Sequence, residues 1–169
     1  MPGVSPFAEW EKQSGATFVE RFGVAVPDDY GDAGGEYQAV RTGVGLVDLS
    51  FRGTLRLTGS ERLRWLNGQI TNEVKALKAG EGCPAAVLTA KGHLLAELVV
   101  YGLEDSALID LQRDRVLPVK EAFERHIIAD DVQVEDVSGR CARLTLVGPE
   151  AQRVVARAVG AAKRRRIAR

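Results

Sequence analysis

Cysteine, histidine, methionine and aromatic residues are all scarce in this chain. Its 169 residues include two cysteines, two histidines and one methionine, and the aromatic residues make up 6%. Cys83 and Cys141 form neither a CxxC pair nor a cluster with histidine. We therefore predict no disulfide framework and no metal site, and interpret both cysteines as buried thiols. No Ser/His/Asp arrangement can be recognised, so catalytic residues stay unassigned.

Long hydrophobic runs are also absent. No stretch approaches the roughly 20 apolar residues that cross a bilayer, and the start MPGVSPFAEW lacks the basic and apolar regions of a secretory signal. We therefore expect a cytoplasmic protein with no membrane segment. The 169 residues, 45% of them hydrophobic, suffice to bury a core without a covalent or metal cross-link.

The chain has no net charge, but its two ends differ. Residues 151–169 hold seven of the 23 basic residues and none of the 23 acidic ones, so the rest is acidic. The basic end could bind nucleic acid electrostatically or be a solvated terminus. Because no aromatic residues are interleaved to stack on bases, we expect a solvated terminus. We predict a helical leader and loop over 1–35, a main domain over 36–157 and a basic tail over 158–169.

Helix and strand patterns alternate along the rest of the chain. The alternation around Leu55 and Leu57 predicts a half-buried strand from Thr54, and Ser60 is predicted to cap the helix that follows. Further elements are predicted as a helix within 5–21, a loop at 27–35, a helix over 36–45, a strand from about 46, a hairpin of strands 84–90 and 94–101, a strand over 107–111, a helix over 114–129, strands over 132–137 and 142–147, and a helix opening at 148–150. This order predicts an α+β fold with a mixed, largely antiparallel sheet packed on helices.

One carboxylate interrupts an otherwise apolar strand. In LLAELVVY, the two-residue period of a strand places Glu97 on one face with Leu95, Val99 and Tyr101. Glu97 either lies on a solvated face or lines a cavity, where burial without a partner would cost several kcal/mol. Composition alone favours the solvated face, and the same comparison applies to Asp110.

Several amide and hydroxyl side chains follow the helix after Ser60. Asn67, Gln69, Thr71 and Asn72 could satisfy turns through bonds to the backbone. They could equally present hydrogen-bonding groups to a heterocycle. The structural role is the more common one for such residues in a turn.

Five segments in order resemble a known family. They are GLVDLS followed by Gly53, LTGSERLRWLNGQITNEVKAL, LTAKGHLLAELVVY, ERHIIADDVQVEDVS and LTLVGPEAQRV, all within about 36–157. Together they resemble the N-terminal folate-binding region shared by glycine-cleavage T-proteins, which are aminomethyltransferases, and their YgfZ-type relatives. No single segment is decisive, but five in register make coincidence improbable.

Details of the resemblance favour the YgfZ-type branch. Where aminomethyltransferases typically carry two adjacent aspartates, this chain has Ala96 and Glu97, so an enzymatic activity stays open. Phe51 and Arg52 replace the usual His-Met pair in a region that lines the family's folate pocket. The YgfZ-type resemblance implies a non-enzymatic or weakly enzymatic protein that supports iron–sulfur cluster assembly or repair and, through it, tRNA modification. The alternatives are a fragment of a tetrahydrofolate-dependent aminomethyltransferase and an interaction domain that has lost its ligand.

The resemblance also implies a ligand, partners and a set of site residues. The ligand would be tetrahydrofolate or a derivative, and the partners would include iron–sulfur proteins but neither a membrane nor, directly, a nucleic acid. The candidate folate-binding residues are Glu97, Arg52, Phe51, Asn72, Gln69 and Tyr101. Family members are usually about twice as long, and the YgfZ-type cysteine signature is absent here. We therefore expect self-association or a missing C-terminal half.

Overall fold

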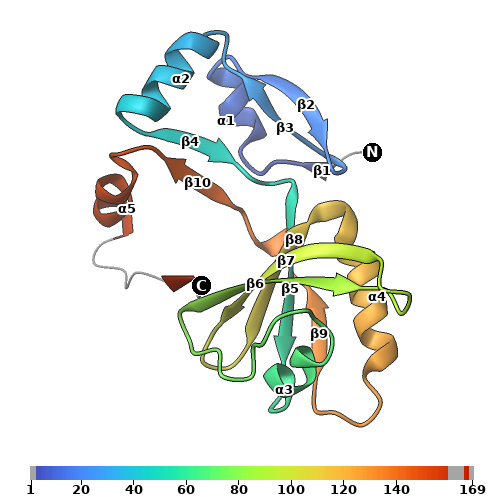
Figure 1. The fold of residues 1–169 in the computed structure, drawn as a ribbon. Coiled ribbons are helices and arrows are strands. Elements are labelled where there is room, and N and C mark those ends of the chain that lie inside the picture. The colour runs from blue at the N-terminus through green and yellow to red at the C-terminus, as the bar shows by residue number, and fades with distance from the viewer. Residues whose placement is uncertain (1–2, 160–165, 168–169) are drawn as a thin grey trace. The chain divides into compact units, whose positions relative to one another are not determined.

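The chain divides into two compact units. The computed structural model describes residues 3–159 and 166–167 (Figure 1). The first unit comprises residues 1–51 and 142–163, and the second comprises residues 52–141 and 164–169. The boundaries between the units therefore fall inside the segment 36–157. Most of the predicted basic tail, 158–169, lies outside the described residues.

A six-stranded sheet forms the second unit. Its strands are β5 (Arg52–Thr58), β6 (Glu81–Leu88), β7 (Leu94–Gly102), β8 (Ala107–Gln112), β9 (Gln133–Asp136) and β11 (Arg166–Ile167). They lie in the order β11-β6-β7-β8-β5-β9, and every neighbouring pair is antiparallel except β11 with β6. The helical elements of this unit are α3 (Arg62–Asn67), α4 (Val116–His126) and the 3₁₀ turns η1 (Arg113–Arg115) and η2 (Ser138–Arg140). The α+β fold with a mixed, largely antiparallel sheet is thereby confirmed.

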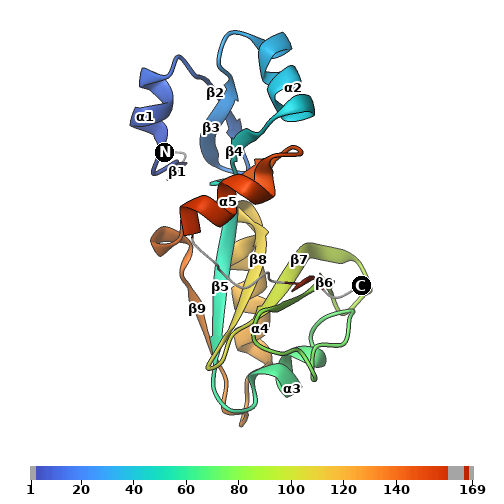
Figure 2. The ribbon, with the colours of Figure 1, turned by 90° about the vertical axis from the view of Figure 1, so that its left-hand side faces the viewer.

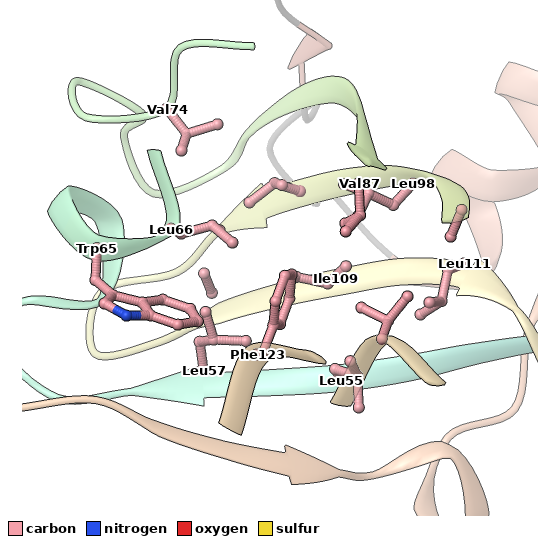
Figure 3. Close-up of a cluster of buried hydrophobic side chains, with 14 of the residues drawn as sticks. Leu55, Leu57, Trp65, Leu66, Val74, Val87, Leu98, Ile109, Leu111 and Phe123 are labelled. Atoms are coloured by element: carbon pink, nitrogen blue, oxygen red, sulfur yellow. The ribbon is translucent and has the colours of Figure 1, made fainter. Parts of the chain in front are cut away.

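One face of this sheet carries the hydrophobic core. Alternate residues of β5, β7 and β8 point to that face because side chains of a strand alternate, and α3 and α4 cover it (Figures 1 and 3). The indole of Trp65 from α3 meets the ring of Phe123 from α4 edge-on, with ring centroids 5.4 Å apart. Cys83 is buried in this core, as expected. Both helices therefore lie on one side, which leaves the opposite face of β6 and β7 free to line a site.

The first unit is built from smaller sheets. A three-stranded sheet orders β1 (Gly3–Val4), β3 (Val24–Asp29) and β2 (Thr17–Arg21), and β4 (Gly45–Asp48) pairs with β10 (Leu144–Val147) in a two-stranded antiparallel sheet. The helices are α1 (Ala8–Gln13), α2 (Ala33–Thr42) and α5 (Ala151–Val159). Figure 2 shows α1 beside the β2–β3 hairpin. The first described residues, Gly3–Val4, therefore belong to this unit, whereas the last, Arg166–Ile167, belong to the sheet of the second unit.

The structure corrects five local predictions. The helix predicted within 5–21 ends at Gln13, and the β2–β3 hairpin follows, with strand β3 reaching into the predicted loop 27–35. Sequence periodicity missed this hairpin because β2 is short and mostly exposed, and only two alternating residues of β3, Val24 and Val26, are buried.

The burial of Cys141 and the start of the last helix also differ from the predictions. Cys141 is exposed, because it lies just past η2 rather than inside a strand. The last helix begins at Ala151, after the predicted start at 148–150.

Ser60 does not cap α3. Its backbone N–H and its hydroxyl both donate to Asp131 Oδ2, at 2.8 and 2.7 Å. The residue before it explains this arrangement: Gly59 has a φ of +101°, and an added Cβ there would lie 2.0 Å from the carbonyl oxygen of Asp131. Only glycine allows the two backbones to approach so closely, and the approach directs Ser60 to Asp131.

Among the described residues, no helix is long and apolar enough to cross a membrane.

Candidate functional site

A solvent-open hollow of about 510 Å³ lies in the second unit. This volume is within the range of about 300–1,000 Å³ that small-molecule sites occupy. Its floor is formed by β6 and β7, and Arg52 of β5 and the loop after α3 contribute to its lining. The lining residues are Arg52, Thr71, Pro84, Ala85, Ala86, Glu97, Leu98 and Val99.

Glu97 supplies the carboxylate of this hollow. It lies opposite Ala86 in the β6–β7 ladder, on the sheet face away from the core, and its side chain is exposed. Glu97 therefore lies on a solvated face of the sheet and also lines a hollow in that face, so the two alternatives stated for it are compatible. Ala96 points the other way and is 5% exposed within the core. A carboxylate at position 96 would enter the core, so of these two neighbouring positions only residue 97 can reach a ligand in the hollow.

Arg52 supplies the positive charge, and Asp110 orients it. The Arg52 Nε donates to Asp110 Oδ1 at 2.9 Å, and a terminal guanidinium nitrogen donates to the Asp110 carbonyl oxygen at 3.3 Å. The side chain of Asp110 is only 7% exposed and that of Arg52 is 23% exposed. Charge-assisted bonds of this kind are short and directional, so they fix the guanidinium at the hollow. The solvated position expected for Asp110 is wrong, because this pairing allows its burial.

The amide-rich loop after α3 is held by its own side chains. Asn67 Oδ1 accepts from the backbone N–H groups of Val74 and Lys75 at 2.8 and 3.3 Å. The hydroxyl of Thr71 accepts from the N–H of Ala86 at 2.9 Å, and the amide of Asn72 donates to the carbonyl oxygen of Pro84 at 2.9 Å. These bonds dock the loop onto the outer edge of β6, which confirms the turn-forming interpretation for these three residues.

The remaining candidates lie apart from the hollow. Gln69 is half-buried in the same loop, and Tyr101 is half-buried further along β7 on the Glu97 face. Phe51 belongs to the first unit, where its ring centroid lies 5.7 Å from that of Phe22. Of the six candidates, Glu97 and Arg52 line the hollow and Asn72 anchors the loop that contributes Thr71 to it. The roles of all six toward a ligand stay predictions.

The apolar floor of the hollow escaped the sequence analysis. Pro84, Ala86 and Val99 are small or compact residues at outward positions of β6 and β7. A run of small outward residues on two paired strands was the available signal, since such residues leave space that larger ones would fill. Without the register between the strands, that signal could not be connected to Glu97.

The chain is thus an α+β protein whose second unit has a hollow that presents a carboxylate and a guanidinium over an apolar floor. The family model of the GCVT N-terminal domain matches residues 7–166. The chain belongs to this family.

The chain is similar to curated aminomethyltransferases. It is 30% identical over 152 residues to the aminomethyltransferase of Halalkalibacterium halodurans, a match that covers 89% of this chain and 41% of that protein. It is 31% identical over 155 residues to the aminomethyltransferase of Bacillus mycoides, which covers 90% and 42%. The chain therefore spans about two fifths of the length of these relatives.

A solved structure supports the fold. The chain superposes on the glycine cleavage system aminomethyltransferase T from Bartonella henselae with a TM-score of 0.86 at 22% identity, covering 94% of this chain and 44% of that one. The names of these relatives favour the aminomethyltransferase alternative over the YgfZ-type interpretation that the sequence analysis placed first. The link to iron–sulfur proteins and tRNA modification gains no support from them.

Proposed function

We propose that this chain forms the tetrahydrofolate-binding part of an aminomethyltransferase of the glycine-cleavage type. The observation that carries the proposal is the exposed carboxylate of Glu97 over the apolar floor of the hollow. Membership of the GCVT N-terminal domain family and the aminomethyltransferase names of the relatives support it. The chain binds and orients the folate, and the full transfer reaction belongs to the longer proteins of the family.

The chemistry of the hollow suits a pterin ring. The flat ring would lie on the compact side chains of Pro84, Ala86 and Val99, which exclude water from one of its faces. The carboxylate of Glu97 would accept two parallel N–H bonds from the amino-pyrimidine edge, the bidentate arrangement that a carboxylate favours. The guanidinium of Arg52, oriented by Asp110, would attract a carboxylate of the glutamate tail.

Calorimetry with tetrahydrofolate tests this assignment. The parent chain is expected to bind, and Glu97→Gln should weaken binding at least about tenfold, because the amide keeps only one acceptor oxygen and loses the charge. Glu104→Gln is the matched control: it removes the same charge from an exposed residue in the turn after β7, outside the hollow. Affinity should be unchanged in this control.

Two outcomes contradict the proposal in different ways. Absence of binding by the parent would overturn folate binding by this chain and favour an interaction domain that has lost its ligand. Binding with equal affinity by the parent and Glu97→Gln would remove Glu97 from the site while leaving folate binding in place. A thermal shift by tetrahydrofolate gives an independent readout, since a ligand that binds only the folded state stabilises it.

A further inference from the structure

Four polar side chains meet inside the first unit. Ser5 precedes α1 and Glu11 lies in α1. Asp48 is the last residue of β4, and Ser50 follows it two residues later. Glu11 is 1% exposed and Ser5 is 3% exposed. The hydroxyl of Ser50 donates to Asp48 Oδ1 at 2.6 Å and lies 3.3 Å from the hydroxyl of Ser5. Neither hydrophobic packing nor the proposed folate site uses this group.

The carboxyl groups of Glu11 and Asp48 each have one oxygen that accepts no hydrogen bond from the residues that the structure describes. Within the described part of the chain, Glu11 Oε2 and Asp48 Oδ2 are buried side-chain oxygens without a hydrogen-bond donor. The side chains of Glu11 and Asp48 interact with each other. Glu11 is buried and Asp48 is half-buried with its Oδ2 inaccessible. Two carboxylates in contact in such surroundings repel each other, whereas a single proton between them turns the repulsion into a hydrogen bond. Glu11 then donates its O–H to Asp48.

Burial and the charge of Asp48 both act on Glu11. Burial, then the negative charge of Asp48 and the hydrogen bond to it, raise the pKa of Glu11 from 4.5 to about 7, while the bond from Ser5 lowers it in part. The same carboxylates act on Tyr30, which follows β3. The pKa of Tyr30 is raised, first by burial and then by the negative charges of Glu11, Asp48 and Glu36. On the side of β10, Arg143 precedes Leu144, which pairs with Asp48.

We propose that Glu11 and Asp48 form a proton-dependent lock that holds helix α1 to the end of strand β4. The lock is closed when the two carboxyl groups share one proton and is weakened when that proton is lost. Because the folded state binds the proton more tightly than the unfolded chain, the stabilisation is complete below pH 4.5 and is lost as the pH rises through about 7. The pH window of the device is therefore about 4.5 to 7.

Carboxyl ¹³C NMR of the full chain observes the proton directly. The resonance of Glu11 is expected to titrate with a midpoint near 7, and a midpoint near 4.5 would overturn the proposal. This measurement needs no substitution, so it stands even if a variant fails to fold. Amide exchange of α1 should accelerate between pH 5 and pH 8 by more than the intrinsic chemical rate does.

A pair of variants separates the lock from general pH effects. Glu11→Gln keeps a donor toward Asp48 without a titrating proton. The parent's unfolding equilibrium constant for the first unit should rise on the order of 100-fold from pH 5 to pH 8, and that rise should largely disappear in Glu11→Gln. Glu9→Gln is the control, because Glu9 lies in the same helix with an 85% exposed side chain. An equally steep rise in Glu11→Gln and the parent would overturn the lock.

Discussion

The two units bury their apolar residues to very different extents. Among the described residues, the second unit contains a cluster of 17 buried apolar side chains from its sheet, its helices and the loops that join them. The buried apolar residues of the first unit are Ala8, Val24 and Val26. Of the residues of the first unit that the structure describes, nine large apolar ones are exposed, including Leu46, Val47, Leu144 and Val147 on its two-stranded sheet. A continuous core therefore stabilises one unit, whereas the other relies on a few contacts and a polar cluster.

This difference has a physical cause in sheet size. A sheet needs several strands and a covering layer before one face becomes inaccessible to water. The six-stranded sheet of the second unit has α3 and α4 over one face. The pair β4–β10 is only four residues long in each strand, so its apolar side chains stay partly exposed. Small sheets of this kind depend on further surfaces to complete them.

The largest expected effect comes from the core of the second unit. Phe123→Ala should lower the free energy of unfolding of that unit by about 3–5 kcal/mol, because it leaves a cavity next to Trp65. Urea unfolding followed by Trp65 fluorescence in a Trp10→Phe background measures it. Leu117→Ala, in the same helix but 63% exposed, should change stability by less than about 0.5 kcal/mol. Similar losses for both variants would show that the core does not dominate this unit.

An intermediate effect is expected in the rate at which strand pairs of the two units open and exchange their amide hydrogens. Amides of the β7–β8 pair should exchange at least about tenfold more slowly than those of the β2–β3 pair, because local stability follows buried apolar contacts. Hydrogen exchange of the parent at pH 6 measures both pairs in one experiment. Equal protection would contradict the comparison between the units and indicate a single cooperative body.

The smallest effect on stability is expected at the exposed sheet of the first unit. We expect a second copy of the chain to cover its apolar side chains, in line with the self-association predicted from the sequence. Val47→Thr should change the free energy of unfolding by less than about 0.5 kcal/mol, since Val47 is 41% exposed. It should nevertheless weaken self-association in light scattering at high concentration. A parent that stays monomeric at every concentration would argue against self-association.

The strongest sequence patterns matched the structure. The Lys91–Gly92–His93 turn joins β6 and β7, and α4 buries Val116, Val119 and Phe123 at helical spacing. Both patterns are local: a strand or helix that faces a core repeats its apolar residues with its own period. The helix over 36–45 was also recognised, because its sequence ends in the glycines at which α2 stops. The β2–β3 hairpin was missed because its strands carry little apolar periodicity.

The candidate site was only partly accessible from sequence. The alternation of β7 placed Glu97 on the face opposite Ala96, as observed. The partner of Arg52 was not accessible, because Asp110 reaches it only through the pairing of β5 with β8. The same holds for Glu11 and Asp48, which lie far apart in the chain and carry no shared motif. Pairings between distant strands are set by packing rather than by any local pattern.

By itself, the sequence determined the α+β class, the family resemblance and the face on which Glu97 lies, because all three depend on local periodicity and the order of segments. Tertiary structure alone decided the division into two units, the pairing of Arg52 with Asp110 and the burial of Glu11 against Asp48. Each of these joins residues from distant parts of the chain. Whether a carboxylate is solvated, paired or forced to share a proton depends on neighbours that only the folded chain supplies.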